Sequence, residues 1–478
     1  MMKVTPVAAL ILLLGPAVVT AVADLAGDAP IRPGSSPAAT RPGAGKYLLL
    51  ESDRIERADG VRLVLGKVAK DAHNPLLVED KPWEVRFDNL YATVMFDEER
   101  RVYRAWYNPF IIDDAVSSTT AAERKKIPYR PTKREMGVCY AVSQDGIAWE
   151  KPALGIVEFN GTTANNLVMR DAHGTGVRMD PLDPDAARRY KAFLMGGVAT
   201  SPDGLHWSKT LPCPEINAAG DTHNNWIWDD ARGRYVGITR LWADRQRIVG
   251  RTESADFRKW SPAVEVLRGD VDHQTYALVV FRYANVYLGL LMIHHRRPDT
   301  VDCELAWSRD TIRWERVCAG TPLIPRGREG EFDSHCLFAA AEPISRDGEI
   351  RLYYGGNNGP HFGWQAGGLG LARLRPDGFA GMAAAKAGEL GTIVTKPIPC
   401  AGRHLQVTAD VGAGGSVRAS VVDADGFALA DGEAIGTDVT DGTVRWRDGR
   451  DLGPCKGKPV RLRFELRAAT LYAFRFTD

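Results

Sequence analysis

The amino-acid sequence predicts an all-β protein in which a five-bladed β-propeller is followed by a C-terminal β-sandwich. Short apolar runs without helical periodicity alternate with Gly, Asp and Pro, a pattern typical of strands and tight turns. One turn motif recurs along most of the chain, at a spacing that suits a repeated structural unit. The repeat stops near residue 385, where short alternating segments separated by Gly and Asp predict a sandwich over residues 386–478.

The repeated motif has the form Ser-x-Asp-x-x-x-Trp. It occurs at Ser143–Trp149, Ser201–Trp207, Ser254–Trp260 and Ser308–Trp314, with a weaker fifth copy at Arg375–Phe379. Its aspartates are 53 to 67 residues apart. The chemistry suits a hairpin turn, because Asp accepts backbone N–H groups and Gly, where it follows the Asp, takes the left-handed conformation. A period of this length fits one four-stranded blade, so the five copies predict five blades over residues 47–385.

The N-terminus predicts export to a secreted or periplasmic location. Residues 1–23 combine one Lys, an apolar run and a small-x-small ending, which is typical of a signal peptide cleaved after Ala23. The alternative is a membrane anchor, which the interruption by Gly15 and Pro16 disfavours. Residues 24–46 are rich in Pro, Gly, Ala and Ser and predict a flexible tether.

Charge and cysteine content restrict the possible partners and cofactors. The formal net charge is +1, so no overall field attracts nucleic acid or an anionic membrane. The seven cysteines have no metal-binding spacing. Either Cys303–Cys318 and Cys400–Cys455 form disulfides or the cysteines are buried free thiols, and the sequence leaves both possibilities open.

The innermost strand of each predicted blade has different polar residues at its two ends. At the C-terminal end of the strand Asp97, Asp180 and Asp229 fall in the following hairpin turn, where aspartate is a common turn residue. We therefore interpret these three as structural. We also expect the strand at Tyr47–Leu50 to pair with the last blade and close the ring.

A carboxylate lies at the start of the inner strand in all five units. These segments are Asp88-Asn89, Asp171-Ala172-His173, Asp221-Thr222-His223, Asp272-His273-Gln274 and Asp333-Ser334-His335. In a propeller the starts of the inner strands converge on the central axis, so the side chains are expected to share one pocket. The alternative is a merely polar channel. For the histidines we favour hydrogen bonds to the carboxylates over metal binding, and we predict no metal and no cofactor.

These features resemble exported five-bladed propeller proteins related to glycoside hydrolase family 32 and, more loosely, family 43. The resemblance is carried by the blade spacing, by the repeated turns, which are also similar to the Asp-box of sialidases, by LGLARLRPDGFAGM at Leu369–Met382 and by the terminal LRFELRAATLYAFRF. It covers almost the whole chain beyond the tether. It implies a propeller followed by a sandwich, and ring closure favours a monomer.

The resemblance also implies a three-carboxylate site. Asp88 matches the family's nucleophile, and Asp171 beside Arg170 matches the residue that grips substrate hydroxyls. Asp221 stands where the family has its Glu acid/base, with Glu331 as the reserve acid. The family's Asn-Asp-Pro-Asn-Gly signature is absent, since this chain has Phe87-Asp88-Asn89-Leu90.

The expected function is that of a secreted glycoside hydrolase acting on a poly- or oligosaccharide, because glycosidic cleavage needs two carboxyl groups. The expected substrate-binding residues are Arg170, His173, His223, Asp272, Gln274, Glu331, Asp333 and His335. Trp83, Tyr276 and Trp364 are further candidates for sugar contacts at the rim. Two other functions remain open, a non-catalytic carbohydrate-binding propeller and a lyase or phosphorylase on the same scaffold. The basic insertion at 113–135 is either one wall of the cleft or a solvated loop.

Overall fold

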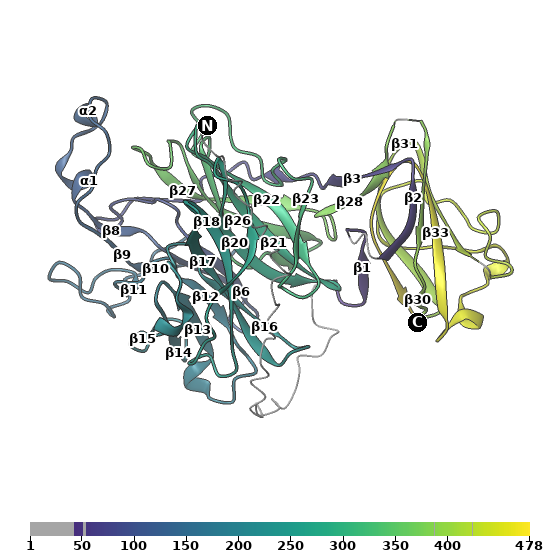
Figure 1. Cartoon of the computed structure of the whole chain (residues 1–478), viewed down its shortest axis with the longest axis horizontal. Helices are drawn as coiled ribbons and strands as arrows, with labels where there is room; N and C mark the ends of the chain where they lie inside the picture. Colours follow the sequence, from purple (N-terminus) through teal and green to yellow (C-terminus); the bar gives the residue numbers. More distant parts are fainter. Residues whose placement is uncertain (1–42, 51–53, 387, 423) are drawn as a thin grey trace, which may run out of the picture. The chain divides into compact units, whose positions relative to one another are not determined.

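The computed structural model describes residues 43–478 except 51–53, 387 and 423. Strands dominate it (Figure 1), which confirms the all-β prediction. Its two α-helices in this part of the chain are short, α1 (Asp114–Ser118) and α2 (Ala121–Arg124). The predicted signal peptide and residues 24–42 of the tether lie outside the described residues. None of the helices in the described ranges has the length and apolar character needed to span a membrane.

The chain forms successive four-stranded antiparallel units. The first contains β6 (Thr93–Asp97), β7 (Val102–Tyr107), β10 (Val138–Ser143) and β11 (Leu167–Met169). The second contains β12 (Gly176–Met179), β13 (Tyr190–Leu194), β14 (Gly197–Ser201) and β15 (Leu211–Pro212). The third contains β16 (Asn225–Asp229), β17 (Arg234–Ala243), β18 (Gln246–Ser254) and β19 (Val264–Arg268). In each unit the first strand along the chain lies at one edge of the sheet.

The fourth and fifth units share one ten-stranded sheet because β22 and β24 pair in parallel. The fourth contains β20 (His273–Tyr283), β21 (Val286–His295), β22 (Thr300–Ser308) and β23 (Trp314–Val317). The fifth contains β24 (Cys336–Ala339), β25 (Ile344–Arg346), β26 (Glu349–Asn357) and β27 (Gly367–Leu374). Two N-terminal strands, β4 (Ala69–Lys70) and β5 (Leu77–Val78), pair with β27 and complete this unit.

The Ser-x-Asp motifs form the predicted hairpin turns between the third and fourth strands. Asp203 Oδ1 accepts the backbone N–H groups of Leu205 (2.8 Å) and His206 (2.9 Å), and Ser201 Oγ accepts that of Gly204. The residue after the aspartate has positive φ in all four full copies, at Gly146, Gly204, Phe257 and Thr311. The weaker fifth copy differs because the chain leaves it for another sheet, at β28 (Ala380–Ala384).

Neighbouring units contact one another at or next to their first strands, except that the fourth unit contacts the fifth through its third strand, β22. The contacts include Val177 N–H to Thr93 Oγ1 (3.2 Å), the parallel bridge Thr175–Asn224, Val280 N–H to Asn225 Oδ1 (3.0 Å) and Val301–Cys336. The fifth unit returns to the first, because the N–H of Ala341 donates to the carbonyl of Ala92 (2.9 Å). The order of contacts is therefore cyclic. Asp97, Asp180 and Asp229 accept backbone N–H groups in the turns after these strands, as predicted.

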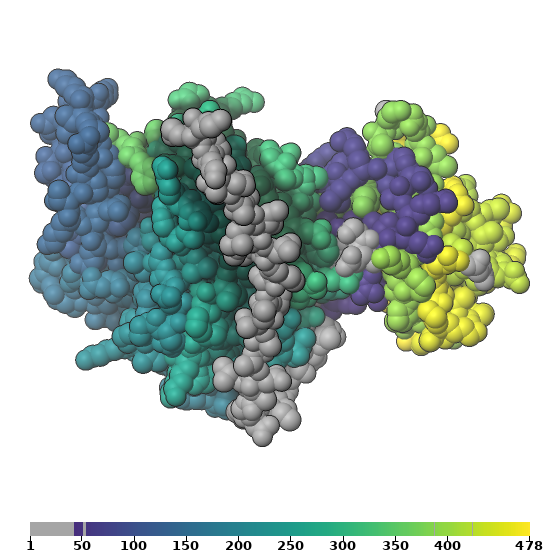
Figure 2. Space-filling view, viewed as in Figure 1, coloured from purple at the N-terminus to yellow at the C-terminus, as the bar shows by residue number. Residues whose placement is uncertain are grey.

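Of the remaining strands, β8 (Phe110–Asp113) and β9 (Arg134–Met136) form a two-stranded sheet, and the others form a nine-stranded sheet around β33 (Pro459–Thr477). Its other strands are β1 (Lys46–Leu48), β2 (Ile55–Asp59), β3 (Val61–Leu65), β28, β29 (Leu390–Thr395), β30 (Ile398–Pro399), β31 (His404–Val422) and β32 (Val439–Thr443). The N-terminal strands, purple in Figure 2, thus lie against C-terminal ones.

This sheet corrects one prediction and changes another. Tyr47–Leu50 was expected to pair with the last blade, but β1 pairs with β33, because Leu49 is buried among C-terminal residues such as Ile393 and Phe464. A separate sandwich over residues 386–478 is not shown, since residues 46–65 and 380–384 share its sheet. The seven cysteines, Cys139, Cys213, Cys303, Cys318, Cys336, Cys400 and Cys455, are all free thiols, so neither candidate disulfide forms.

Candidate functional site

A buried polar cluster lies at the starts of the first strands, centred on the ring of Tyr276. Asn89 Nδ2 donates to the hydroxyl groups of both Tyr91 and Tyr276. The guanidinium groups of Arg240 and Arg247 lie 4.3 and 5.1 Å from the centre of the Tyr276 ring. We call this group, with its neighbours Asp88, His173, Asp221 and His223, the Tyr276 cluster.

Asp88 is the buried carboxyl group of the cluster, with a side chain only 9% exposed. Gln365 Nε2 donates to its Oδ1 at 2.6 Å. Arg86 and Arg134 approach Oδ2 only to 3.9 and 3.8 Å, which is too far for a hydrogen bond. Burial raises the pKa of Asp88. The attraction of the two arginines and the Gln365 hydrogen bond lower it, but by less than burial raises it. The negative charge of Asp221 raises the pKa further.

Asp221 has the opposite environment, with a side chain 53% exposed. His173 Nε2 lies 2.8 Å from its Oδ1, and Arg240 Nη1 lies 3.3 Å from its Oδ2. Partial burial opposes ionisation, but the His173 hydrogen bond and the charges of Arg240, His173 and Arg247 outweigh it and lower the pKa of Asp221. The two carboxyl groups therefore interact while favouring opposite protonation states.

These environments disagree with the roles predicted from the sequence. Asp221 was the expected general acid, yet its surroundings stabilise the carboxylate. Asp88 was the expected nucleophile or base, yet its surroundings stabilise the acid. Glu331, the reserve acid, is exposed and accepts the backbone N–H of Arg328 at 2.9 Å, and its contacts in the described part of the chain do not include the cluster.

The third predicted carboxylate, Asp171, is not brought into the cluster by any contact in the described ranges. It is exposed and has a left-handed φ of 49°. Its neighbour Arg170 points its Nε and Nη2 at the carboxylate of Glu135, at 2.7 and 2.8 Å. The Asp171 backbone also hydrogen-bonds Glu135. Glu135, at the end of the insertion, thus holds both residues, and the contribution of the second unit to the cluster is His173.

Two further predicted substrate-binding residues reach the Tyr276 cluster. His223 is buried with its ring 5.5 Å from that of Tyr91, and burial lowers its pKa to about 4, so the imidazole is neutral. The backbone of Ala339 opposes this shift, although neither ring nitrogen has a hydrogen-bond partner of good geometry among the described residues. Gln274 is buried and accepts from Arg247 Nη1 at 2.8 Å.

Three other predicted substrate-binding residues have their hydrogen-bond or ion-pair partners outside the Tyr276 cluster. Asp333 is buried and forms an ion pair with Lys70, and it also accepts from the Tyr354 hydroxyl (2.8 Å). Asp272 is half exposed and lies 3.2 Å from Arg297, and His335 Nδ1 lies 3.0 Å from Ser334 Oγ. In the ranges that the structure describes, no group of three or more His, Cys, Asp or Glu side chains is placed to hold a metal ion.

Sequence reasoning missed Arg240, Arg247, His294 and His361. The His294 ring lies 5.2 Å from that of His361, which lies 4.9 Å from that of Tyr276. The available signal was strand pairing, because the end of a second strand lies beside the start of the first in an antiparallel hairpin. Gln274 pairs with His294 in this way.

The insertion at 113–135 contributes to the site and is more than a solvated loop. It contains α1 and α2, which Figure 1 shows projecting from the strands. Its Tyr129 ring lies 4.0 Å from the guanidinium of Arg86, and the carbonyl of Ile127 accepts from Trp364 Nε1 at 2.8 Å. Arg134 from the same segment approaches Asp88.

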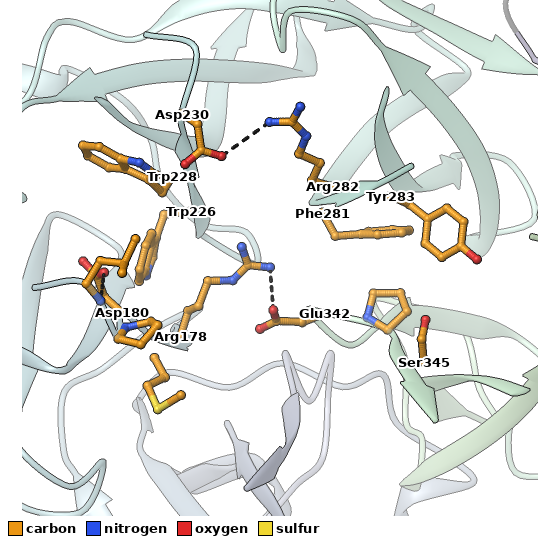
Figure 3. A pocket seen from close by; sticks show the side chains of 14 residues that line it. Arg178, Asp180, Trp226, Trp228, Asp230, Phe281, Arg282, Tyr283, Glu342 and Ser345 are labelled. Carbon is orange, nitrogen blue, oxygen red and sulfur yellow. Dashed lines mark hydrogen bonds and ion pairs between the residues drawn. The ribbon is translucent and has the colours of Figure 1, made fainter. Parts of the chain in front are cut away.

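A cavity of about 280 Å³ lies at the opposite, turn end of the first strands. Figure 3 shows Arg178 directed at Glu342 (3.1 Å) and Arg282 at Asp230 (3.5 Å) across it. Trp226 and Trp228 line the same cavity. Since Asp180 also lines it, the cavity belongs to the turns that were interpreted as structural and not to the carboxylate site.

Comparison with known proteins gives no family model and no curated protein that matches this chain. Solved structures match at low similarity. A β-1,2-mannobiose phosphorylase from Listeria innocua is 12% identical, over 65% of this chain and 97% of that chain, with a TM-score of 0.45. The α-L-arabinofuranosidase from Podospora anserina is 12% identical, over 65% and 98%, with a TM-score of 0.45. A glycosyl hydrolase from Bacteroides ovatus is 13% identical, over 64% and 94%, with a TM-score of 0.42.

These distant neighbours are glycoside hydrolases and a phosphorylase, and they do not specifically show the predicted link to family 32. At such similarity the chemistry of this chain depends on its own site.

Proposed function

We propose that the protein is a glycoside hydrolase whose active site is the Tyr276 cluster. The observation that supports this most strongly is the pair Asp88 and Asp221, two interacting carboxyl groups whose pKa values are shifted in opposite directions. Pairs of this kind separate the acid and base roles in one site, because one group keeps its proton while the other stays ionised.

In the proposed mechanism Asp88 donates its proton to the leaving glycosidic oxygen. Asp221 is the ionised partner, which attacks the anomeric carbon or activates a water molecule as oxocarbenium character develops. His173 and Arg240 stabilise the Asp221 carboxylate, and the buried surroundings of Asp88 keep its proton available. These roles are the reverse of those predicted from the sequence alone.

We further propose that the five four-stranded units are the blades of a propeller, and that residues 1–23 direct export. The cyclic order of contacts, closed between Ala341 and Ala92, supports the first proposal. The completion of the fifth unit by β4 and β5 supports it as well, since propellers commonly close their ring with strands from both parts of the chain.

The proposal is tested by mutating the pair against turn controls. Asp88→Asn and Asp221→Asn are expected to lose about 10²–10⁴-fold in turnover. Asp97→Asn and Asp229→Asn, in the turns, are expected to affect mainly stability. The assay is release of reducing ends from a polysaccharide panel, with the melting temperature of each variant measured in parallel.

A chemical rescue distinguishes the two roles. Azide is expected to restore turnover to Asp221→Ala, because a small anion replaces the missing nucleophile or base, and to do so less for an acid variant on the same substrate. Near wild-type turnover in Asp88→Asn and Asp221→Asn at unchanged melting temperature would reject the roles proposed for these two residues. Absence of turnover by the wild-type protein on every member of the panel would reject the hydrolase and favour a carbohydrate-binding protein.

A further inference from the structure

Arg247 has an unusual position at the edge of the Tyr276 cluster. It is 8% exposed, and its Nη1 donates to Gln274 Oε1 at 2.8 Å. Its buried Nε has no hydrogen-bond partner among the described residues, and its Nη2 donates to none of them either. No carboxylate in this part of the chain lies within ion-pair distance of it, since Asp221 is paired with His173 and Arg240.

The unpartnered atoms are the Nε and Nη2 side of the guanidinium, the edge that binds a carboxylate through two parallel hydrogen bonds. The same edge is filled in other arginines of this chain. Arg170 binds Glu135 through it at 2.7 and 2.8 Å, and Arg316 binds Glu304 through it at 2.9 and 2.7 Å. A buried donor without a partner costs free energy, so the open edge of Arg247 indicates a missing acceptor.

Two exposed aromatic rings flank this arginine. Trp242 is 55% exposed, pairs with Arg247 across the β17–β18 hairpin and has its ring 5.2 Å from the guanidinium. Phe362 is 60% exposed with its ring 5.7 Å away. Exposed rings beside a polar group suit the apolar face of a sugar ring. A free oxyanion such as phosphate has no apolar face to cover these rings.

We propose that Arg247, Trp242 and Phe362 form a subsite for an acidic sugar, in which the open edge of Arg247 binds the carboxylate of a uronic acid residue. This inference deepens the proposed function, because it names the substrate class of that site as a uronate-containing glycan. His294 and His361, each with one unpartnered buried Nδ1, lie beside Phe362 and provide further donors or acceptors for the sugar hydroxyls.

The test compares two ligands that differ only at the carboxyl group. Trigalacturonate and its carboxyl-reduced, neutral counterpart, together with triglucuronate and its reduced form, are titrated into the full chain by calorimetry, with inorganic phosphate as a third probe. In at least one pair the acid is expected to bind ten- to a hundredfold more tightly than the neutral form. Arg247→Gln is expected to abolish that preference. Trp242→Ala is expected to weaken the binding of both ligands of the pair.

Arg316→Gln is the matched control, because the same edge of that arginine is already filled. It is expected to keep the preference for the acid. Equal binding of the acid and neutral forms in both pairs would overturn the proposal. This result can be observed with the wild-type protein alone. Phosphate binding that depends on Arg247, without any preference between the sugars, would assign the edge to a free oxyanion and also overturn it. Since the comparison of acid and neutral ligands does not require turnover, loss of catalysis in the carboxylate variants leaves this test unaffected, and hydrolysis of neutral glycans alone leaves the proposed function standing.

Discussion

The ring of Tyr276 is expected to hold the two buried arginines in place, which predicts different effects for two substitutions. Tyr276→Phe keeps the ring and removes only the hydroxyl, which accepts from Asn89 at 2.8 Å. Asn89 Nδ2 retains the Tyr91 hydroxyl as a partner. The Tyr276 hydroxyl also lies 3.4 Å from the Tyr91 hydroxyl. The expected cost is therefore that of one or two hydrogen bonds, about 0.5–3 kcal/mol.

Tyr276→Leu removes the ring itself. The guanidinium groups of Arg240 and Arg247, at 4.3 and 5.1 Å from its centre, are both buried. A cation–π contact between desolvated groups contributes about 2 kcal/mol, so losing both costs about 4 kcal/mol. Because Arg240 also lies 3.3 Å from Asp221, the Leu variant is expected to lose turnover at least tenfold more than the Phe variant.

The measurement is urea unfolding of the full chain, with the midpoint and slope compared between variants. Phe338→Leu is the matched control, since Phe338 is equally buried, contacts the Tyr276 ring at 5.4 Å and has no cation over its own ring within the described part of the chain. It is expected to cost less than about 1.5 kcal/mol. A cost for Tyr276→Leu no larger than that for Phe338→Leu would refute the role of the ring.

Three other predictions test the charges and the termini. The folded state raises the pKa of Asp88, so the stability due to its protonated form is present at low pH and lost as pH rises through the folded pKa. The melting temperature of Asp88→Asn is therefore expected to exceed that of the wild type by an increasing margin as pH rises above the ordinary aspartate pKa of 3.8, whereas a margin that does not change with pH contradicts the shift. Lys46 is buried against the fully buried Asp377 at 2.6 Å, so Lys46→Met is expected to cost about 3–5 kcal/mol in urea unfolding, and the exposed Lys386→Met under 0.5. Mass spectrometry of the protein produced from the full sequence in an export-competent host is expected to find an N-terminus after Ala23, and a retained Met1 would contradict cleavage.

The parts of the structure that the sequence predicted are those that local chemistry determines. The Ser-x-Asp turns were predictable because the aspartate at 203 binds backbone N–H groups only two and three residues away. The order of strands followed from the spacing of these turns. The pairing of β1 with β33 was not predictable in this way, because it joins residues more than 400 positions apart and depends on which core buries Leu49.

In the candidate site, too, the residues that could be predicted are those whose positions depend on local sequence. Asp88, His173, Asp221, His223 and Gln274 were predicted from their position before each first strand, and the structure brings them to one cluster. Asp171 has no contact with the cluster among the described residues, because Glu135, from a segment distant in sequence, binds Arg170 and the Asp171 backbone. Arg240 and Arg247 were missed because their positions depend on hairpin register, which a list of strand starts does not include.

The contrast between Asp88 and Asp221 arises from their surroundings, because the residues themselves are identical and occupy corresponding positions in two repeated units. Asp88 follows Phe87, whose N–H is held by Glu79 Oε1 at 2.8 Å, and its side chain is enclosed while its cations stay beyond hydrogen-bond range. Asp221 remains half exposed and has direct contacts with His173 and Arg240. Desolvation therefore dominates at Asp88 and attraction dominates at Asp221. A repeat that places equivalent carboxyl groups in one cluster can thus provide both an acid and a base, because the residues around each carboxyl group differ from unit to unit.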